Sequence, residues 1–217
     1  LRSLFENAEF LQAAREFCEM IAPYAAVNAL AQCLLRLTSP GVADTYQGTE
    51  LWHQAFVDPD NRRPVDFELR SRMLAGIRER LGDRARLAPE LVEDYASGAI
   101  KLYVTHQCLS VRRKHPELFL QGDYQALPAS EHVVAFTRAV EAQRLIVCVP
   151  RLGYVLTHGS KPFALGEVWR DMELPIPARG RYENVFTGEK LALSRSVRLS
   201  ELLRAFPLAL LVREGSA

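Results

Sequence analysis

The polar side chains of residues 58–63 are the strongest candidates for chemistry in this sequence. The segment reads D-P-D-N-R-R, so carboxylates, an amide and guanidinium groups follow one another closely. Ionised side chains make the strongest hydrogen bonds in proteins, and the hydroxyl groups of a sugar ring can donate to carboxylates and accept from arginines. We therefore predict a binding loop for a polyhydroxylated ligand, formed by Asp58, Asp60, Asn61, Arg62 and Arg63.

Four further side chains precede this segment and complete the predicted binding site. Tyr46 and Trp52 offer flat apolar faces, on which the apolar face of a sugar ring can stack. Gln47 and Glu50 either contact the ligand or brace the neighbouring loop, and we favour ligand contact. For the aspartates and arginines, the alternative is an internal ion pair that only shapes the loop, as surface pairs often do.

The aspartates of this loop are poor candidates for catalysis. A pair of carboxylates can act as nucleophile and protonated acid when the two groups lie about 5–5.5 Å apart. Side chains two positions apart in an extended segment lie about 6.5–7 Å apart, which does not exclude Asp58 and Asp60. However, a neighbouring guanidinium lowers a carboxyl pKa, whereas a general acid needs its pKa raised towards the working pH. We therefore predict no catalytic residue in the loop.

A helix and a short apolar run must position this loop. Pro40 and Gly41 stop a periodic helix, and the apolar run 42–46 that follows ends before Gly48. Helix, strand and then a polar loop is the order in which an α/β barrel presents its working face, because the loops after its strands carry the chemistry. An ordinary surface loop with solvated ion pairs is the alternative.

The first 121 residues are predicted to be mostly helical. Ser3 and Glu6 have the spacing of a capping box, Pro23 suits the first turn of a second helix, Asp66 is a plausible N-cap, and Pro116 stops the last helix. Residues 100–114 contain β-branched residues, but their apolar positions recur at helical spacing and the run is long for a strand. The predicted helices span residues 3–20, 23–37, 67–81, 89–96 and 100–114.

The character of the chain changes near Gly122. From there, short apolar segments alternate with glycine- and proline-rich turns, which is the pattern of an antiparallel β-sandwich. A helical turn is expected at residues 199–205, before the last strand. The predicted strands span residues 133–136, 145–149, 168–172, 182–186 and 207–213.

Two stretches of the sequence resemble a known enzyme family. Both stretches are similar to the end of the catalytic barrel of the maltooligosyl trehalose synthases. Residues 40–52 read P-G-V-A-D-T-Y-Q-G-T-E-L-W, and residues 57–66 read V-D-P-D-N-R-R-P-V-D. The Y-x-G-x-E core occurs widely in the α-amylase clan, whereas D-P-D-N-R-R-P-V-D is much more specific. The resemblance resumes at residues 100–105, 115–119 and 122–124 and thins towards residues 206–207. Ala43 stands where the family usually has proline, and His53 where an acidic residue is usual.

The resemblance implies a fold and an activity. It implies that residues 1–121 are the C-terminal part of a (β/α)8 barrel and that residues 122–217 are an appended β-sandwich. The complete enzyme is expected to be an isomerase, a (1→4)-α-D-glucan 1-α-D-glucosylmutase, which converts the reducing-end α-1,4 linkage of maltooligosaccharides to an α,α-1,1 linkage without a nucleotide cofactor. The clan takes its catalytic acids from strands four, five and seven, so we expect them before this chain and expect the chain alone to be inactive.

Two other functions remain open at this point. The chain could come from another hydrolase or transglycosidase of the α-amylase clan, although the D-P-D-N-R-R-P-V-D run argues against it. It could also be a non-catalytic carbohydrate-binding or assembly module.

Composition limits the partners and the compartment. The formal net charge is +1, so no strong field favours nucleic acid or an anionic membrane. We see no apolar run near the roughly 18 residues of a membrane span and no signal peptide, and expect a cytoplasmic protein.

The histidines show no metal-ligand spacing, so no metal is expected. The chain begins with Leu, so we expect preceding polypeptide, the rest of the barrel, as a partner, or self-association through the apolar surface that a partial barrel exposes.

The cysteines agree with a reducing compartment. Cys18, Cys33, Cys108 and Cys148 are dispersed, with no C-x-x-C spacing. We expect reduced and mostly buried side chains that behave as small hydrophobic groups. A disulfide pair is the alternative.

Overall fold

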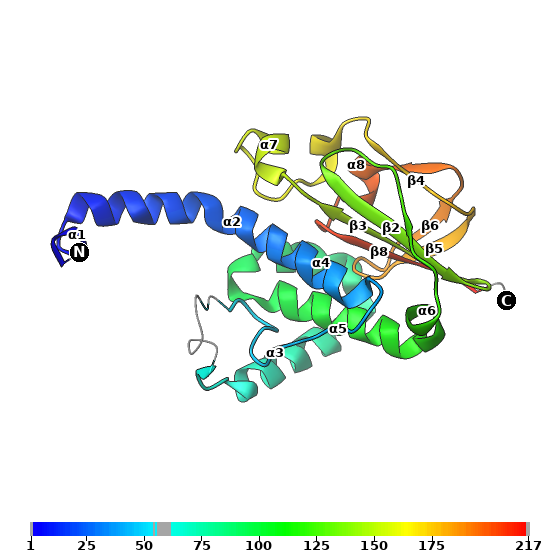
Figure 1. The fold of residues 1–217 in the computed structure, drawn as a ribbon, viewed down its shortest axis with the longest axis horizontal. Coiled ribbons are helices and arrows are strands. Elements are labelled where there is room, and N and C mark those ends of the chain that lie inside the picture. The colour runs from blue at the N-terminus through cyan, green and yellow to red at the C-terminus, as the bar shows by residue number, and fades with distance from the viewer. Residues whose placement is uncertain (1, 54, 56–61, 216–217) are drawn as a thin grey trace.

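The protein combines a helical layer with an antiparallel sheet, so the mixed α and β composition is confirmed (Figure 1). The computed structural model describes residues 2–53, 55 and 62–215. The long helices come first in the chain and lie below the sheet in the view of Figure 1, whereas short helical segments of the second part of the chain lie above it. The predicted boundary between domains at residues 121 and 122 stays a prediction, and one hydrophobic core extends across it.

The first long helix is continuous, so the prediction of separate helices over 3–20 and 23–37 is wrong. Helix α1 spans Arg2–Phe5, and α2 spans Ala8–Thr38 with Pro23 inside it. The α2 N-cap is Asn7, whose side chain accepts a hydrogen bond from Phe10 N at 3.0 Å, in place of the predicted capping box. A proline fixes φ near the helical value and removes only one donor, and the alanine-rich flanking turns favour a helix strongly enough to continue through it.

The segment after α2 forms no strand, so the strand predicted over residues 42–46 is also wrong. Val42 is 97% exposed, and the guanidinium of Arg36 donates to Asp44 O and to Thr45 Oγ1. A single strand has no backbone partner of its own and forms only beside a neighbouring strand. Among the described residues, no strand lies alongside this segment.

The remaining helices confirm most of the predicted pattern. Helix α3 spans Phe67–Glu79 and begins at the predicted N-cap, where the Asp66 carboxylate accepts from Leu69 N at 2.8 Å. The predicted helix over residues 100–114 is α5, Ala99–Lys114, and α6, Pro116–Leu120, begins where we expected only a stop. In place of the predicted helix over residues 89–96, the structure has α4, which begins at Arg84 and ends at Glu93. The short elements between α3 and α5 are η2 (Leu81–Asp83), α4 (Arg84–Glu93) and η3 (Tyr95–Ser97).

The second part of the chain forms one large antiparallel sheet and one small one. The large sheet has the order β1-β2-β3-β8-β5-β6, and β4 pairs with β7 apart from it. The strands are β1 (Gln125–Ala126), β2 (Val133–Val140), β3 (Gln143–Pro150), β4 (Glu173–Pro175), β5 (Gly180–Asn184), β6 (Lys190–Leu193), β7 (Ser196–Arg198) and β8 (Ala209–Arg213). The short helices are α7 (Gly153–Thr157), η4 (Gly166–Trp169) and α8 (Leu199–Leu202). The predicted helical turn is therefore confirmed as α8. The predicted strand at 168–172 is wrong, because the buried Trp169 ends a 3-10 helix.

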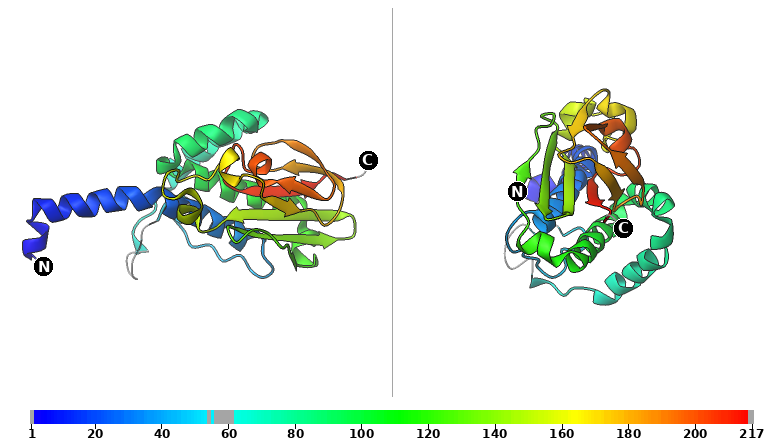
Figure 2. Two further views of the ribbon diagram at one scale, coloured as in Figure 1. Left: turned by 90° about the horizontal axis from the view of Figure 1, so that it is seen from above. Right: turned by 90° about the vertical axis from the view of Figure 1, so that its right-hand side faces the viewer.

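Each face of the large sheet has its own core. Leu145 and Val147 of β3 face the helical layer, whereas the alternating Ile146 and Cys148 face the side that carries Trp169, as the two-residue period of a strand requires. Between the helices and the sheet, Tyr103 of α5 donates its hydroxyl to Phe186 O at 2.6 Å. The second view of Figure 2 shows the long helices on one side of the sheet.

The N-terminal half of α2 projects away from the body of the molecule (Figures 1 and 2). Its large apolar side chains are exposed, including Phe10, Phe17 and Met20. The helix is long and apolar enough, by length and composition alone, to cross a membrane, which corrects our prediction from the apolar runs. Since its C-terminal half is buried against α5 and β3, a partly buried core helix accounts for the same composition.

Candidate functional site

A single arginine of α3 forms hydrogen bonds to both ends of the predicted binding loop. Arg70 Nε donates to Glu50 Oε2 at 3.0 Å, Nη2 donates to Gly48 O at 2.9 Å, and Nη1 donates to Asp66 O at 3.0 Å. The guanidinium and the carboxylate are both largely buried, so this pair is shielded from solvent better than a surface ion pair. Arg70 therefore fixes where the loop leaves and returns to the helical layer.

A tight turn at Gly48 brings the loop close to its own return segment. Gly48 has a φ of +87°, and a Cβ placed there would lie 3.1 Å from Val65 Cγ2. The Thr49 hydroxyl donates to Tyr46 O at 2.6 Å and closes the turn. Only glycine adopts this φ at no steric cost, so the residue type at this position determines the direction of the loop.

Beyond the turn, the loop passes over an open cleft of about 350 Å3 beside α2. One wall is a row of small side chains on α2, and the other comes from the loop, from η3 and from α5. The lining residues are Ala22, Ala25, Ala26, Ala29, Trp52, His53, Tyr95, Ala96 and Lys101. Because alanines at this spacing share one helix face, they leave room for the aromatic side chains opposite. We call this space the Trp52 cleft.

Trp52 is oriented by contacts on two sides. Its indole Nε1 donates to Tyr95 O at 2.7 Å, and the Lys101 ammonium lies 5.7 Å from the centre of its ring. Lys101 also donates to Leu51 O at 3.1 Å. Burial lowers the pKa of the Lys101 ammonium below its ordinary value, because the charged form loses water. Gly98, with a φ of +82°, permits the close approach, since a Cβ there would lie 3.3 Å from Trp52 N.

The structure brings together only some of the residues that the sequence singled out. Trp52 lines the cleft, Glu50 contacts Arg70 and so braces the loop, and Tyr46 and Gln47 are exposed in the turn before it. Arg62 and Arg63 lie exposed just before α3. Asp58, Asp60 and Asn61 lie outside the described residues. The ligand contacts predicted for all nine residues remain predictions.

Sequence reasoning missed Tyr95, Lys101 and the alanine face of α2. Their signal was present but weak: Gly98 marked a turn after Tyr95, and the alanines recur at positions 22, 25, 26 and 29, which is the spacing of one helix face. Neither feature indicates which loop lies opposite. That pairing depends on contacts between residues more than 40 positions apart in the chain, such as Trp52 with Tyr95.

The Trp52 cleft can bind a ligand, but its lining carries no acid for catalysis. It offers an indole face, a phenol and an ammonium group, which suit the apolar face and the hydroxyl groups of a sugar. None of its described lining residues is a carboxylate. Within the described part of the chain, no group of three His, Cys, Asp or Glu residues could hold a metal ion.

Comparisons with known proteins confirm the resemblance noted in the sequence. No family model matches the chain. A protein of Mycobacterium tuberculosis strain H37Rv, which carries the provisional name maltooligosyl trehalose synthase, is 36% identical over 197 residues. The alignment covers 89% of this chain and 21% of that protein. The chain therefore spans about a fifth of the length of the curated relative that it matches.

Solved structures agree in fold. The structure of maltooligosyltrehalose synthase from Arthrobacter ramosus has a TM-score of 0.77 and 31% identity, and the match covers 94% of this chain and 24% of that one. A second structure of a maltooligosyl trehalose synthase has a TM-score of 0.71 and 28% identity over 98% of this chain and 25% of that one. An Anoxybacillus α-amylase, at a TM-score of 0.55 and 14% identity, shares the fold only.

Proposed function

We propose that this chain, which is similar to maltooligosyl trehalose synthases over almost its whole length, is the C-terminal portion of such an enzyme. What supports this proposal is the 36% identity over 197 residues, together with a fold match at a TM-score of 0.77. A chain that covers about a fifth to a quarter of these proteins fits a portion better than a whole. In the complete enzyme, residues 1–121 would end the catalytic barrel, and residues 122–217 would form the appended β domain.

The complete protein would be an intramolecular transglucosylase, which moves a glucosyl unit onto the C1 hydroxyl of the adjoining sugar. Such a reaction must keep the transferred unit from water, and closing the site is the physical route to that selectivity. The catalytic acids would come from polypeptide outside this chain. This chain would supply the wall of the pocket that positions the reducing-end sugar.

Within this wall, the loop of residues 50–66 has the central role. Arg70 fixes its two ends, because its guanidinium donates to the Glu50 carboxylate and to Asp66 O. A loop with fixed ends can hold a sugar hydroxyl in one geometry, which is what separates transfer from hydrolysis. Trp52 would stack on a glucose face at the edge of the same pocket.

The product ratio of the complete enzyme tests this proposal. In the full-length protein, we expect Arg62→Ala and Arg63→Ala to raise hydrolysis relative to formation of the α,α-1,1 product, measured by product chromatography on maltopentaose. Arg72→Ala is the matched control, because Arg72 is an exposed arginine of α3 whose partner is Glu68 one turn away. An unchanged product ratio in both loop variants would count against the proposal.

A second measurement separates this function from a free-standing binding module. If the chain is part of the enzyme, the 217 residues alone should not convert maltooligosaccharides, and activity should appear only with the preceding polypeptide present. Tight maltooligosaccharide binding by the chain alone, with no preceding coding sequence in the same frame, would favour the binding module.

A further inference from the structure

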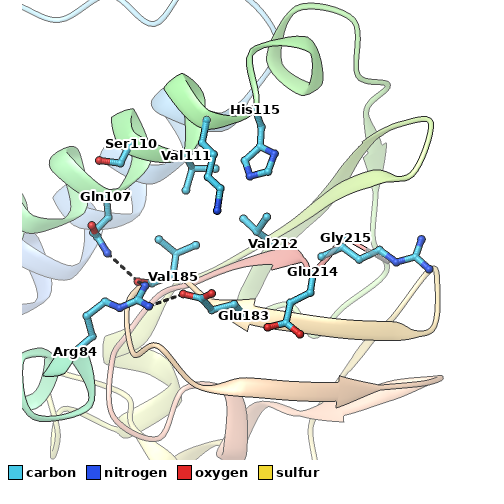
Figure 3. A pocket seen from close by; sticks show the side chains of 12 residues that line it. Arg84, Gln107, Ser110, Val111, His115, Glu183, Val185, Val212, Glu214 and Gly215 are labelled. Atoms are coloured by element: carbon cyan, nitrogen blue, oxygen red, sulfur yellow. Dashed lines mark hydrogen bonds and ion pairs between the residues drawn. The ribbon is translucent and has the colours of Figure 1, made fainter. Parts of the chain in front are cut away.

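A second pocket lies between the helical layer and the large sheet, and its lining differs from that of the Trp52 cleft. It lies between the C-terminal half of α5 and the ends of β5 and β8, and it encloses about 340 Å3 (Figure 3). We call it the seam pocket. No residue is shared between the linings of the two pockets.

The floor of the seam pocket is apolar. Val111 of α5, Val185 after β5 and Val212 of β8 approach one another from three elements (Figure 3). Val111 and Val185 are buried, and Val212 is half-buried. An aliphatic group bound here would be removed from water on three sides, and such burial is favourable in proportion to the apolar area covered.

Both carboxylates of the pocket already have cationic partners. Glu183 accepts from Arg84 Nη2, and Arg84 Nη1 donates to Val185 O at 3.0 Å, where Gln107 Nε2 also donates at 3.0 Å. Glu214 pairs with Lys190 at 2.8 Å. These contacts hold the acidic wall in place and offset the charge of both carboxylates.

The opposite rim carries the Lys114 ammonium, which, unlike Arg84 and Lys190, is not paired with a carboxylate among the described residues. Lys114 lines the pocket at the end of α5. The α5 dipole favours a positive charge at this end, but Arg112 and Arg113 satisfy the same preference. What distinguishes Lys114 from these two arginines is that it lines the pocket with the floor of valines.

We propose that the seam pocket binds a small organic monoanion, with its carboxylate on the Lys114 ammonium and a short aliphatic chain on Val111, Val185 and Val212. A phosphate dianion is disfavoured, because it has no aliphatic part to cover the three valines and so gains nothing from burial of the apolar floor. A sugar is disfavoured because the lining, unlike that of the Trp52 cleft, contains neither tryptophan nor tyrosine and so lacks a stacking surface.

Titration of this chain with butanoate, pentanoate and hexanoate, followed by NMR, tests the proposal. Each added methylene should tighten binding by about fourfold until the floor is covered, and hexanamide, which lacks the charge, should bind at least about fivefold more weakly than hexanoate. Binding that is independent of chain length, or equal binding of inorganic phosphate and hexanoate, would overturn it. So would no binding of hexanoate at about 50 mM.

Two charge-reversal variants at neighbouring positions locate the site. Lys114→Glu should weaken hexanoate binding by about tenfold, whereas Arg113→Glu, an equal change of charge at an exposed neighbour that does not line the pocket, should weaken it by less than about twofold. Equal losses in both variants would mean that only the general field of the helix end attracts the anion, and would overturn the proposal. Because no glucan is used, the result is independent of the proposed enzyme function.

Discussion

The two halves of α2 both carry large apolar side chains but lie in opposite environments. In the C-terminal half, Leu30, Leu34 and Leu37 are at most 1% exposed and pack in the core between the helices and the sheet. In the N-terminal half, Phe10 and Phe17 are 43% and 57% exposed. One continuous helix thus passes from a packed interior to a largely exposed surface.

This difference means that the exposed half gains little stability from tertiary packing in this structure. Most helical stability in proteins comes from packing of an apolar face, because short isolated helices are marginal in water. A contiguous exposed apolar surface usually marks an interaction site. In the proposed function, the exposed half meets the rest of the catalytic barrel, and in its absence we expect self-association. Three of the following predictions test that contrast, and one tests a thiol buried in the sheet.

Thiol reactivity should show the largest difference between the halves, because α2 carries one cysteine in each. Cys18 is exposed and Cys33 is buried, with its Sγ 3.4 Å from Thr105 Oγ1. A buried thiol reacts only after local or global opening, so we expect Cys33 to react with DTNB at least about 1000-fold more slowly than Cys18. Cys18→Ser should remove the fast phase. A fast phase that persists in this variant would show that the packed half opens readily.

Truncation of one leucine in each half should separate their contributions to stability. Leu34→Ala removes a fully buried side chain and should lower the free energy of unfolding by about 2–5 kcal/mol. Leu11→Ala, in the exposed half, should change it by less than about 0.5 kcal/mol. Urea denaturation measures both. Equal losses would mean that the exposed half is packed in solution, for example in an oligomer.

Alkaline pH should destabilise the protein through its buried thiols. Burial raises the pKa of Cys148 from 9.0 to about 12, so above pH 9 the unfolded state releases this proton while the folded state keeps it. Stability is therefore complete below pH 9 and falls as the pH rises towards 12, by about 1.4 kcal/mol at pH 10. Cys148→Val should remove that part of the decline in urea denaturation, whereas Cys18→Ala, at the exposed thiol, should leave it unchanged. An identical decline in the valine variant would contradict the assignment.

Self-association should depend on the exposed half of α2, and a substitution there should have the smallest effect of the four predictions. Phe17→Glu should lower the association constant in sedimentation by about fivefold, which corresponds to about 1 kcal/mol for partial burial of one aromatic side chain. Gln12→Glu adds the same charge to an exposed polar position of this half and should change the constant by less. A wild-type chain that sediments as a sharp monomer at high concentration would show that this surface does not associate.

Local chemistry was enough to predict several elements. The N-cap at Asp66, the period of α5 and the turns after Gly122 each depend on residues close together in the chain, and the structure confirms them. The short strands β1, β4, β6 and β7 escaped prediction because each is defined by its partner more than by its own residues. The Trp52 cleft could not be predicted either, because its walls come from four separate segments.

By itself, the sequence determined the family resemblance, the polar loop and most helix positions, because motifs, caps and periodicity are properties of neighbouring residues. Only the tertiary structure decided that Pro23 lies inside a helix, that residues 42–46 form no strand and that one half of α2 is left exposed. These outcomes depend on which distant segments are present to pack or to pair. Burial and backbone pairing are free-energy terms between elements, and no single stretch of the chain encodes them.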